Sequence, residues 1–580
     1  MSGSPEMRLD TGSRVAVIGG GPAGSLFSYF LMTMGERIGI ELCVDIYEPK
    51  DYSRPGPAGC NMCGGIISET LVQLLSTEGI NLPTTVVQRG IESYVLHMDV
   101  GSVRIEPPRK EKRIAAIHRG AGPRGIDGRR WGSFDAHLLE LASAKGANVV
   151  RERVDGVEWT NGKPCVVTKS GVGGEYDLLV GAVGVNSPFL KYFESLDPGF
   201  HPPGTAKTWI CEFFLGAETI RSYFGSSMHV FLLNLPRLEF AAIIPKGDYV
   251  TVCLLGEGID AKLVERFLSS PEVKKCFPPG WSVPADFCRC APSINVSGAP
   301  KPFSDRVVFV GDAGVSRLYK DGIGGAYRTA KAAAKTAVFE GVSADDFRKH
   351  YMPVCRALNR DNQVGKVIFL VTRLIQGLRF ARRGVLRMTS AEQGGSPRRQ
   401  RMSGVLWDTF TGSAPYRDVF LRTLNPAFLG RLAYATGVEL WPVRRRMWMK
   451  EDKVELGGLG KVYKPGEIIV RQGDVGDCMY VVQSGKVEVI KEKDGKEVRL
   501  AELVEGDFFG EMALFEKGAV RSASVRPVGE VRVLSVDKRM FLRKIHDDPS
   551  LAFRVMQKMA GRIRELNNEM MRFSVEQQGA

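Results

Sequence analysis

Long hydrophobic segments are missing from this 580-residue sequence. No continuous apolar run is long enough to span a bilayer, and residues 1–6 lack the apolar core of a signal peptide. We therefore expect a cytoplasmic protein with reduced thiols. The hydrophobic content of 44% is ordinary for a globular protein, and the length suffices for three or more compact units.

Ligand-spaced cysteines and nucleic-acid-binding signatures are scarce as well. The eleven cysteines are scattered, and although Cys60 and Cys63 have C-x-x-C spacing, no second such pair completes a zinc or iron–sulfur ligand set. We therefore expect no metal. The net charge of +14 favours an anionic partner or surface, but no helix-turn-helix or RNA-binding signature accompanies it, so we expect no DNA.

A glycine-rich turn is the strongest signal in the first half of the chain. Residues 15–18 are typical of a buried parallel strand, and Gly19, Gly21 and Gly24 fit the G-x-G-x-x-G pattern that precedes a helix. Such a turn lets the backbone approach a pyrophosphate, which then lies against the free N–H groups of the helix N-terminus. The sequence therefore predicts a dinucleotide site here.

Two further features belong to this site. Pro22 and Ala23 open the helix that would face the phosphates. A second strand over 42–47 ends in Glu48, and an acid at that point can accept hydrogen bonds from an adenosine ribose. The strand, the helix and the terminal acid thus follow one another in the order that the motif requires.

The order of the later segments resembles a known family. The Cys-Gly-Gly loop at 63–65, the F-D-x-x-L helix start at 134–138, the G-A-x-G strand end at 181–184 and the V-G-D segment at 310–312 are similar to motifs of single-Rossmann FAD oxidoreductases. These enzymes have the para-hydroxybenzoate hydroxylase fold, and the geranylgeranyl reductase group is the most similar. The resemblance covers about residues 12–440 and implies FAD as cofactor, with NAD(P)H or another reductant as a transient donor.

The resemblance also implies which residues hold FAD. Asp312 would accept hydrogen bonds from ribityl hydroxyls, and the start of an alanine-rich helix, predicted over 329–338, could face the flavin pyrimidine edge. Trp131 occupies the place of the family's arginine, and Arg130 lies one residue earlier. The further implied contacts are Gly64, Gly65, Gly311, Gly324 and Gly325.

The candidate catalytic side chain in this half is Cys63. It could line the flavin face, gate the site or donate a proton. Equally, the loop could simply need a small residue before two glycines. Hydride would come from the reduced flavin, and the sequence assigns no proton donor.

Two predicted strands, 208–214 and 228–233, mark a β-sheet substrate domain. His229 fits a satisfied sheet residue better than a catalyst. Phe240 and Pro245 align with a Tyr-x-Trp-x-Phe-Pro motif of prenyl reductases, from which Ala242 and Ile244 depart. An apolar wall remains, and it favours an isoprenoid or lipid substrate.

A basic connector follows the predicted flavin-binding segments. Residues 364–378 predict an amphipathic helix punctuated by lysine and arginine, and Arg444 to Arg446 lie beside two tryptophans. Such a helix can bind an anionic membrane, at the inner face for a cytoplasmic protein. The alternative is a helix packed on the FAD domain with a solvated charged face.

Short strands and regular turns from about residue 456 predict a β jelly roll. F-G-E-M at 509–512 and R-S-A at 521–523 closely resemble the phosphate-binding cassette of cyclic nucleotide-binding domains. The resemblance implies that Arg521 pairs with the cyclic phosphate, that Glu511 accepts from the ribose 2′-OH, and that Gly510, Ser522 and Ala523 complete the anion site. Phe509 and Met512 belong to the same cassette.

The final predicted helix, 551–573, would cover the base and could form a homodimer. Leu566 and Asn567 fall near the base contacts of the cAMP receptor protein, which leaves cAMP and cGMP both open. No DNA-binding domain is expected after it.

These observations predict an α/β Rossmann-type FAD domain with a β-sheet substrate domain and a C-terminal jelly-roll domain with a lid helix. The predicted function is an FAD-dependent oxidoreductase that reduces an apolar substrate under cyclic nucleotide control. The alternative is a non-catalytic flavin and cyclic-nucleotide sensor or scaffold acting through a protein partner. The predicted ranges are 12–195 and 301–345 for FAD binding, 196–300 for substrate, 346–450 for the connector and 456–573 for the cyclic nucleotide.

Overall fold

A computed structural model provides the fold, and the chain divides into two compact units. The first comprises Met1–Glu69, Thr84–Lys110 and Ile114–Gly458, and the second comprises Thr70–Pro83, Glu111–Arg113 and Leu459–Ala580. The structure describes residues 7–106, 111–124, 132–196, 199–393, 400–438, 458–493, 496–515, 520–538, 541–542, 545, 552–553, 555–564 and 567.

A mostly parallel six-stranded sheet, in the order β20-β21-β12-β1-β2-β8, forms the first layer of unit 1. Its central strands are apolar and buried, as strands covered on both faces must be. Ile18, at the end of β1, pairs with Gly181 on one side and Tyr47 on the other. The strands are β1 (Arg14–Ile18), β2 (Cys43–Tyr47), β8 (Asn148–Val150), β12 (Leu178–Gly181), β20 (Phe303–Ser304) and β21 (Val307–Phe309).

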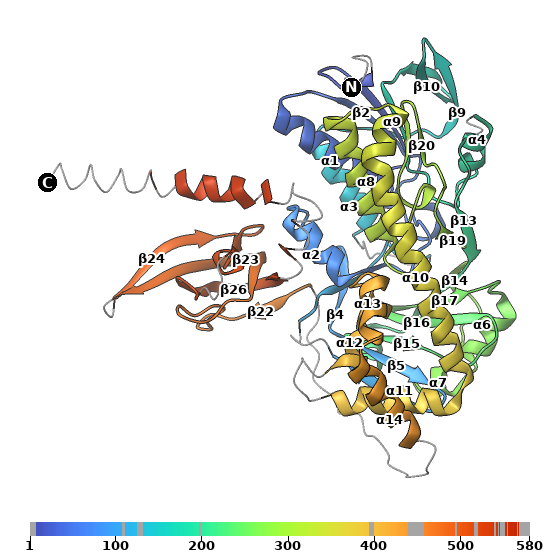
Figure 1. The fold of residues 1–580 in the computed structure, drawn as a ribbon, viewed down its shortest axis with the longest axis vertical. Helices are drawn as coiled ribbons and strands as arrows, with labels where there is room; N and C mark the ends of the chain where they lie inside the picture. The colour runs from blue at the N-terminus through green and yellow to red at the C-terminus, as the bar shows by residue number, and fades with distance from the viewer. Residues whose placement is uncertain are drawn as a thin grey trace. The chain divides into compact units, whose positions relative to one another are not determined.

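Three helices pack on or beside this sheet. Helix α1 (Pro22–Ile38) packs against both α3 (Phe134–Ala144) and α8 (Gly322–Phe339), as Figure 1 shows. Gly39 ends α1 in the left-handed conformation, and the Ser133 hydroxyl caps α3 by accepting from the Ala136 N–H. The helices predicted after the glycine turn and from Phe134 are confirmed, and α8 begins at Gly322, seven residues before its predicted start at Thr329.

A seven-stranded sheet, in the order β18-β14-β17-β16-β15-β5-β6, forms the second layer. Strand β16 is buried along its whole length, because apolar clusters cover both faces. Two of its strands come from residues 93–105, far before the other five in the chain. The strands are β5 (Ser93–Met98), β6 (Gly101–Ile105), β14 (Trp209–Phe214), β15 (Ser227–Phe231), β16 (Leu238–Lys246), β17 (Tyr249–Gly256) and β18 (Cys288–Cys290).

Shorter elements connect the two sheets of unit 1. Strand β7 pairs with β3 and β4, β10 lies between β9 and β11, and β13 pairs with β19. These strands are β3 (Ile66–Ile67), β4 (Val87–Ile91), β7 (Ile114–Ile117), β9 (Val154–Thr160), β10 (Lys163–Thr168), β11 (Gly171–Glu175), β13 (Gly204–Lys207) and β19 (Ser293–Ser297). The short helices are α4 (Phe189–Leu196), α5 (Ala217–Tyr223), α6 (Ala261–Leu268) and α7 (Pro271–Lys274).

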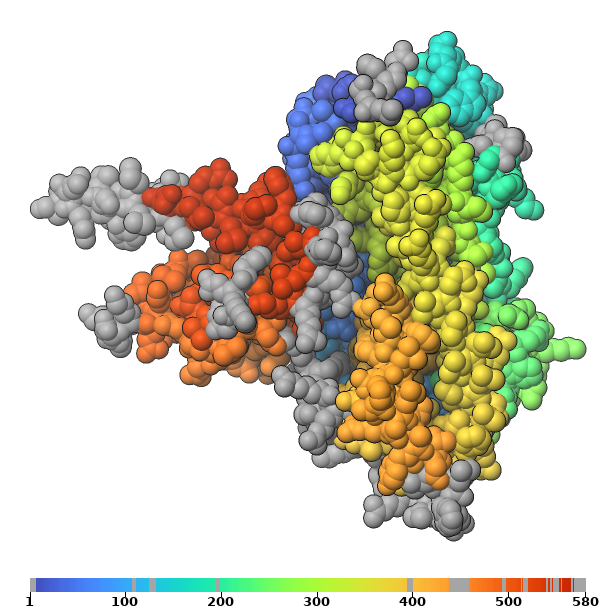
Figure 2. All heavy atoms as spheres, viewed as in Figure 1, coloured from blue at the N-terminus to red at the C-terminus, as the bar shows by residue number. Residues whose placement is uncertain are grey.

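Helices form the last part of unit 1. A capping box at Ser343 and Asp346 starts this helical segment. In Figure 2, the yellow and orange atoms of the segment cover much of the face toward the viewer. The helices are α9 (Ala344–Asp346), a π-helical turn (Phe347–Tyr351), α10 (Met352–Gly377), α11 (Arg379–Glu392), α12 (Arg401–Thr411), α13 (Tyr416–Thr423) and α14 (Pro426–Val438). No helix among the described residues is long and apolar enough to cross a bilayer.

The second unit is built on a five-stranded antiparallel sheet around the long strands β23 and β26. Glu111–Arg113 adds to it, since the Gly460 N–H donates to the Lys112 carbonyl at 2.8 Å. The elements are α2 (Glu69–Thr77), β22 (Lys461–Tyr463), β23 (Cys478–Lys493), β24 (Lys496–Leu503), β25 (Phe508–Phe509), α15 (Met512–Phe515) and β26 (Ser524–Asp537).

Candidate functional site

The glycine turn between β1 and α1 has two tightly packed glycines and one open one. A Cβ at Gly19, where φ is +107°, would lie 2.6 Å from the Ala182 carbonyl oxygen, and a Cβ at Gly24 would lie 1.9 Å from the Gly19 oxygen. At Gly21 the nearest atom would be Asn61 Nδ2, at 3.6 Å. Gly19 and Gly24 are therefore required by packing, whereas Gly21 leaves space in front of the helix N-terminus. That space fits the approach of a pyrophosphate.

Glu48 anchors this turn. Its carboxylate accepts from the Gly20 N–H (2.9 Å), the Tyr52 hydroxyl (2.6 Å) and the Lys50 N–H (2.8 Å), and the residue is 6% exposed. Burial, together with the Glu48 charge, raises the pKa of Tyr52, so the phenol stays protonated and donates. A carboxylate offers about four acceptor positions, and these three donors leave one of them for a ribose hydroxyl.

Arg119 is a site residue that the sequence analysis missed. Its guanidinium grips the buried Asp135 carboxylate with two hydrogen bonds, one of them from Nη2 at 2.8 Å. Burial alone would lower the pKa of Arg119, but Asp135 outweighs it and raises that pKa. Arg119 Nη2 would lie 3.8 Å from a Cβ at Gly21, so this cation faces the open side of the turn. The predicted Arg130 lies outside the described residues.

The Cys-Gly-Gly loop has a packing reason of its own. A Cβ at Gly64 would lie 2.8 Å from Cys253 Sγ. Gly65 has a φ of +66°, and a Cβ there would lie 2.1 Å from the Ile117 carbonyl oxygen. Both glycines are therefore needed whether or not they contact a cofactor, and their predicted role in FAD binding stays a prediction.

The second predicted FAD motif joins the starts of α1 and α8. Gly311 has a φ of +64°, and a Cβ there would lie 2.6 Å from the Ala23 Cβ, at the first turn of α1. Its N–H donates to the Thr329 hydroxyl of α8 at 2.8 Å. A Cβ at Gly324 would lie 2.3 Å from the Asp321 carboxylate, and one at Gly325 would lie 3.1 Å from Ser316 Oγ. The motif therefore depends on close backbone packing.

Asp312 is half-buried beside these glycines. Burial raises its pKa, while a hydrogen bond with Ser316 and the charge of Arg119 act in the opposite direction. Asp312 thus lies beside the glycines of the second motif, and its predicted role in FAD binding stays a prediction.

A pocket in unit 1 lies where the loop after β2, the end of β7 and the seven-stranded sheet converge. Its lining includes Cys60, Cys63, His118, Glu212, Lys246 and Cys290. Glu212 accepts from the Thr251 hydroxyl at 2.9 Å, and its Oε1 lies 3.6 Å from His118 Nδ1 and 3.8 Å from Lys246 Nζ. The pocket is therefore lined by charged and sulfur-bearing side chains.

Protonation in this pocket follows from burial. Burial, together with the charge of Lys246, lowers the pKa of His118 well below its ordinary value, so that imidazole is neutral at physiological pH. Burial raises the pKa of Cys60 to about 11, so this side chain is a thiol rather than a thiolate. Lys246, with a side chain only 1% exposed, supplies the cation beside Glu212. Cys63 is half-buried in the same lining.

The predicted apolar wall is covered by helices. Phe240, Ala242 and Ile244 are at most 3% exposed, and the Phe240 ring stacks on Phe369 of α10 with centroids 5.8 Å apart. Lys320 lies over the same ring, 4.2 Å from its centroid, and burial lowers the pKa of Lys320 to about 8. These three wall residues therefore belong to a packed core.

In the second unit, Arg521 is buried and has no carboxylate partner among the described residues. Its guanidinium donates to the carbonyls of Gly510 (2.9 Å) and Cys478 (2.8 Å), and the residue is 7% exposed. Gly510 has a φ of +76°, and a Cβ there would lie 2.4 Å from the guanidinium. A buried, uncompensated cation in a cradle that only glycine permits fits a phosphate.

Glu511 has a partner that the sequence analysis did not foresee. Arg562, on the C-terminal helical segment, donates to the Glu511 carboxylate at 3.2 Å and to the Phe508 carbonyl. One turn earlier, Lys558 donates to the Asp507 carboxylate at 2.6 Å. The helical segment is thus held to the cassette by two cations.

The other predicted nucleotide contacts differ in their burial. Phe509 is buried and stacks on Tyr480 with centroids 5.2 Å apart, and Ala523 is buried. Met512, Ser522 and Asn567 are exposed. Leu566 lies outside the described residues, so its predicted base contact cannot be located.

The predicted basic connector is helical, and it exposes apolar side chains. Val367, Leu370, Val371 and Leu374 of α10 are 44–60% exposed and recur at helical spacing. Lys366 and Arg379 are exposed nearby, while Arg373 pairs with Glu239. Binding to an anionic membrane stays a prediction, and Arg444 to Arg446 lie outside the described residues.

Comparisons with known proteins identify the second unit. A family model for the cyclic nucleotide-binding domain matches residues 460–548. The cAMP-activated global transcriptional regulator CRP of Salmonella typhimurium is 35% identical over 102 residues, which are 17% of this chain and 49% of that protein. The cAMP-dependent protein kinase regulatory subunit of Schizosaccharomyces pombe is 40% identical over 82 residues, 14% of this chain and 19% of that protein. The chain thus spans about half the length, or less, of these curated relatives.

For the first unit, a similar solved structure is a flavoprotein/dehydrogenase from Cytophaga hutchinsonii. It has a TM-score of 0.50 and 14% sequence identity, and the alignment covers 74% of this chain and 99% of that one. The predicted fold class is confirmed: a flavoprotein-type α/β fold in the N-terminal region and a cyclic nucleotide-binding domain of β strands after it. The resemblance to the geranylgeranyl reductase group stays a prediction.

The open glycine of the predicted FAD site provides a direct test. We expect Gly21→Ala to fold normally, because its Cβ would make only ordinary contacts, but to bind FAD at least tenfold more weakly, because the methyl group fills the approach to the pyrophosphate. The measurement is FAD affinity from flavin fluorescence. Gly430→Ala, where no atom lies within 4 Å, is the control. Unchanged FAD affinity in Gly21→Ala would contradict the assignment.

The cassette arginine provides a second test. We expect Arg521→Lys to weaken cyclic nucleotide binding about 100-fold, because an ammonium cannot reproduce a planar guanidinium fork and each charge-assisted hydrogen bond contributes about 1.5–3 kcal/mol. Titration calorimetry with cAMP and cGMP measures it. Arg526→Lys, on the strand β26 that follows Arg521 and paired with Glu488, should bind normally. An affinity for both nucleotides within twofold of the wild type would rule out Arg521 as the phosphate ligand.

Proposed function

We propose that this chain is an FAD-dependent oxidoreductase that reduces an apolar, isoprenoid- or lipid-like substrate and is regulated by a cyclic nucleotide. The observation that carries the proposal is the space at Gly21, faced by Arg119 and bounded by the Glu48 network. Arg119 also lines the pocket of titratable groups in unit 1, so the space at Gly21 and this pocket share a residue. When bound, FAD would supply hydride transfer.

The residues of the chain have separate parts in this proposal. Gly19, Gly21 and Gly24 shape the phosphate approach, and Glu48 and Asp312 accept hydrogen bonds from sugar hydroxyls. Substrate reduction needs a proton as well as a hydride. The ammonium of Lys246, held 3.8 Å from Glu212, is the group in the pocket best suited to deliver that proton.

The substrate class rests on the resemblance to prenyl reductases more than on the pocket. Phe240, a wall residue expected from the sequence, is packed against α10. Ile210 of β14, which was not expected to belong to the wall, lines the pocket instead. A substrate with an apolar chain and a polar head would match a lining that combines Ile210 with Lys246 and Arg289. We therefore favour an amphiphilic isoprenoid or lipid.

A route for regulation by a cyclic nucleotide runs from β26 through Glu111–Arg113 to β7. Strand β26 begins three residues after Arg521, and its Ser535 donates two hydrogen bonds to Glu111, at 2.8 and 2.6 Å. Glu111–Arg113 is counted with the second unit, yet the next residues are β7 of unit 1, which leads into His118 and Arg119. A shift of β26 on nucleotide binding would thus be transmitted along the chain toward the pocket.

The second candidate function is a sensor or scaffold without turnover. The observation that favours it is the burial of Phe240, Ala242 and Ile244 beneath helices, which removes the wall that a prenyl substrate would use. In that case, flavin would bind and respond to the redox state while a protein partner carries the output.

The spectrum of the purified full chain decides between these functions. We expect a yellow protein whose flavin band bleaches on anaerobic reduction by NADPH or dithionite. An alkene or quinone acceptor should reoxidise it at a rate that saturating cAMP or cGMP changes at least twofold. Arg521→Lys should keep the flavin and lose the response. A protein that stays colourless with added FAD would contradict the proposed enzyme activity. A flavin that is reduced and reoxidised at the same rate with and without either nucleotide would contradict only the proposed regulation.

The contact between Arg562 and Glu511 makes a further prediction about regulation. The ribose and Arg562 compete for the same carboxylate, so Arg562→Gln should bind cyclic nucleotide several-fold more tightly, since a partly exposed ion pair contributes about 0.5–1 kcal/mol. Arg564→Gln, on the same helical segment and exposed, is the matched control. Affinity is measured by calorimetry. Weaker binding in Arg562→Gln would mean that Arg562 contacts the nucleotide itself.

A further inference from the structure

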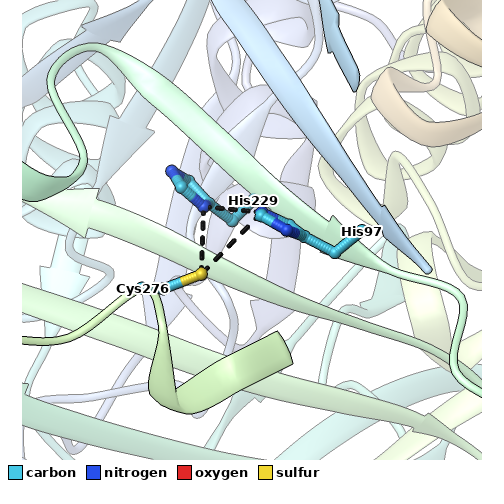
Figure 3. A group of neighbouring side chains, drawn as sticks. All are labelled: His97, His229 and Cys276. Carbon is cyan, nitrogen blue, oxygen red and sulfur yellow. Dashed lines mark hydrogen bonds between the residues drawn. The ribbon is translucent and has the colours of Figure 1, made fainter. Parts of the chain in front are cut away.

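Two histidines and a cysteine converge in the seven-stranded sheet region of unit 1, away from the pocket lining described above. His97 lies on β5, His229 on the neighbouring strand β15, and Cys276 follows α7 (Figure 3). In the register of these strands, His97 is opposite Phe231, so the two histidines lie two residues apart on the same face. Three elements thus bring three metal-ligating side chains together.

The distances between the ligand atoms suit a metal ion. His97 Nε2 and His229 Nδ1 are 2.9 Å apart, and Cys276 Sγ lies 3.5 Å from His229 Nδ1 and 3.8 Å from His97 Nε2. For a triangle with these sides, the point equidistant from its corners lies about 2.0 Å from each atom. That is the length of a metal–imidazole bond, and metal–thiolate bonds are slightly longer, at about 2.3 Å.

The surroundings hold the ligands in a form that can bind. His97 Nδ1 is 2.8 Å from the Ser102 hydroxyl, which turns Nε2 toward the other two atoms, as an outer hydrogen bond does for metal-bound histidines. His97 Nε2, His229 Nδ1 and Cys276 Sγ all lie within 3.8 Å of one another, so these three atoms are the ones that would bind an ion.

The charge of the three ligands determines whether a monovalent or a divalent ion is favoured. Aromatic side chains, including Phe224 and Phe231, pack around the histidines. With two neutral imidazoles and one thiolate, a divalent ion would leave a buried net positive charge, whereas a monovalent ion gives a neutral site. Two imidazoles and one thiolate in a near-trigonal arrangement are also the ligand set that suits copper.

We propose that His97, His229 and Cys276 form a binding site for one copper ion, taken up as Cu(I). On binding, the ion replaces the hydrogen bond between the two imidazoles, and the Cys276 thiol loses its proton as the copper–sulfur bond forms. Because the thiolate is the form of cysteine that ligates a metal, about one proton per ion is released to solution. The copper stays in the +1 state throughout this step, so no electron donor or acceptor is needed.

The three side chains are 5–7% exposed, whereas Phe231 and Phe267 beside them are fully buried. The cluster therefore lies just below the surface, within reach of an ion after a small opening. The site is independent of the proposed flavin chemistry, because none of its three ligands lines the pocket with Lys246 and Glu212. It can therefore be tested without substrate or cyclic nucleotide.

The test compares the full chain with Cys276→Ser, which preserves shape but removes the thiolate. Both are titrated anaerobically with Cu(I) in competition with a chromogenic Cu(I) chelator. Cys165→Ser, at a buried cysteine outside the cluster, is the matched control. We expect the wild type and the control to bind one tight copper more than Cys276→Ser, with about one proton released. The difference cancels any copper bound by the cysteines of the pocket.

X-ray absorption of the copper-loaded wild type gives the second readout. We expect two nitrogen ligands and one sulfur ligand, and thermal unfolding at a higher temperature with copper in the wild type but not in Cys276→Ser. Equal copper binding by wild type and Cys276→Ser would overturn the site. Displacement of Cu(I) by an equimolar amount of Zn(II) would overturn the choice of metal.

Discussion

The close approach of α1 to the end of β1 is the constraint on which the first unit depends. A Cβ at Gly24 would lie 1.9 Å from the Gly19 oxygen, so only glycine lets the helix start where it does. That position brings Ala23 against Gly311 and leaves Gly20 N–H to be bound by Glu48. The ends of the strands, two helix starts and a buried carboxylate therefore gather around one turn, where the proposed cofactor phosphate would approach.

The buried carboxylates at this edge are bound by donors of the chain itself. Glu48 and Asp135 are both buried, and each is satisfied by several donors of the chain. Removing one partner of a buried ion pair such as Arg119–Asp135 typically costs about 3–5 kcal/mol, because the other charge is left buried and uncompensated. The arrangement around Gly21 is thus maintained by the protein itself, and a bound cofactor would meet donors and acceptors that are already oriented.

Local patterns in the sequence predict the parts of this structure whose contacts are local. The β1–turn–α1 segment, the strand ending at Glu48 and the fold class all follow from adjacent residues with a definite order. The sequence missed the contacts that span long separations: Arg119 faces Gly21, Arg562 pairs with Glu511, and His97 meets His229 across 132 residues. No periodicity links such positions, because sheet topology and helix docking alone bring them together. The expected absence of metal rested on C-x-x-C spacing, which says nothing about ligands donated by separate strands.

The placement of Glu111–Arg113 bears on how two functions can share one chain. A flexible tether between domains transmits little, because it absorbs displacement as conformational entropy. Here Arg113 is bound to Glu111, Ser535 and Asp537, and its next residue begins a buried strand. Strand β7 thus begins directly after residues that are bound to β26, and it leads into His118 and Arg119. The proposed regulation would use this stretch of chain if nucleotide binding displaced β26.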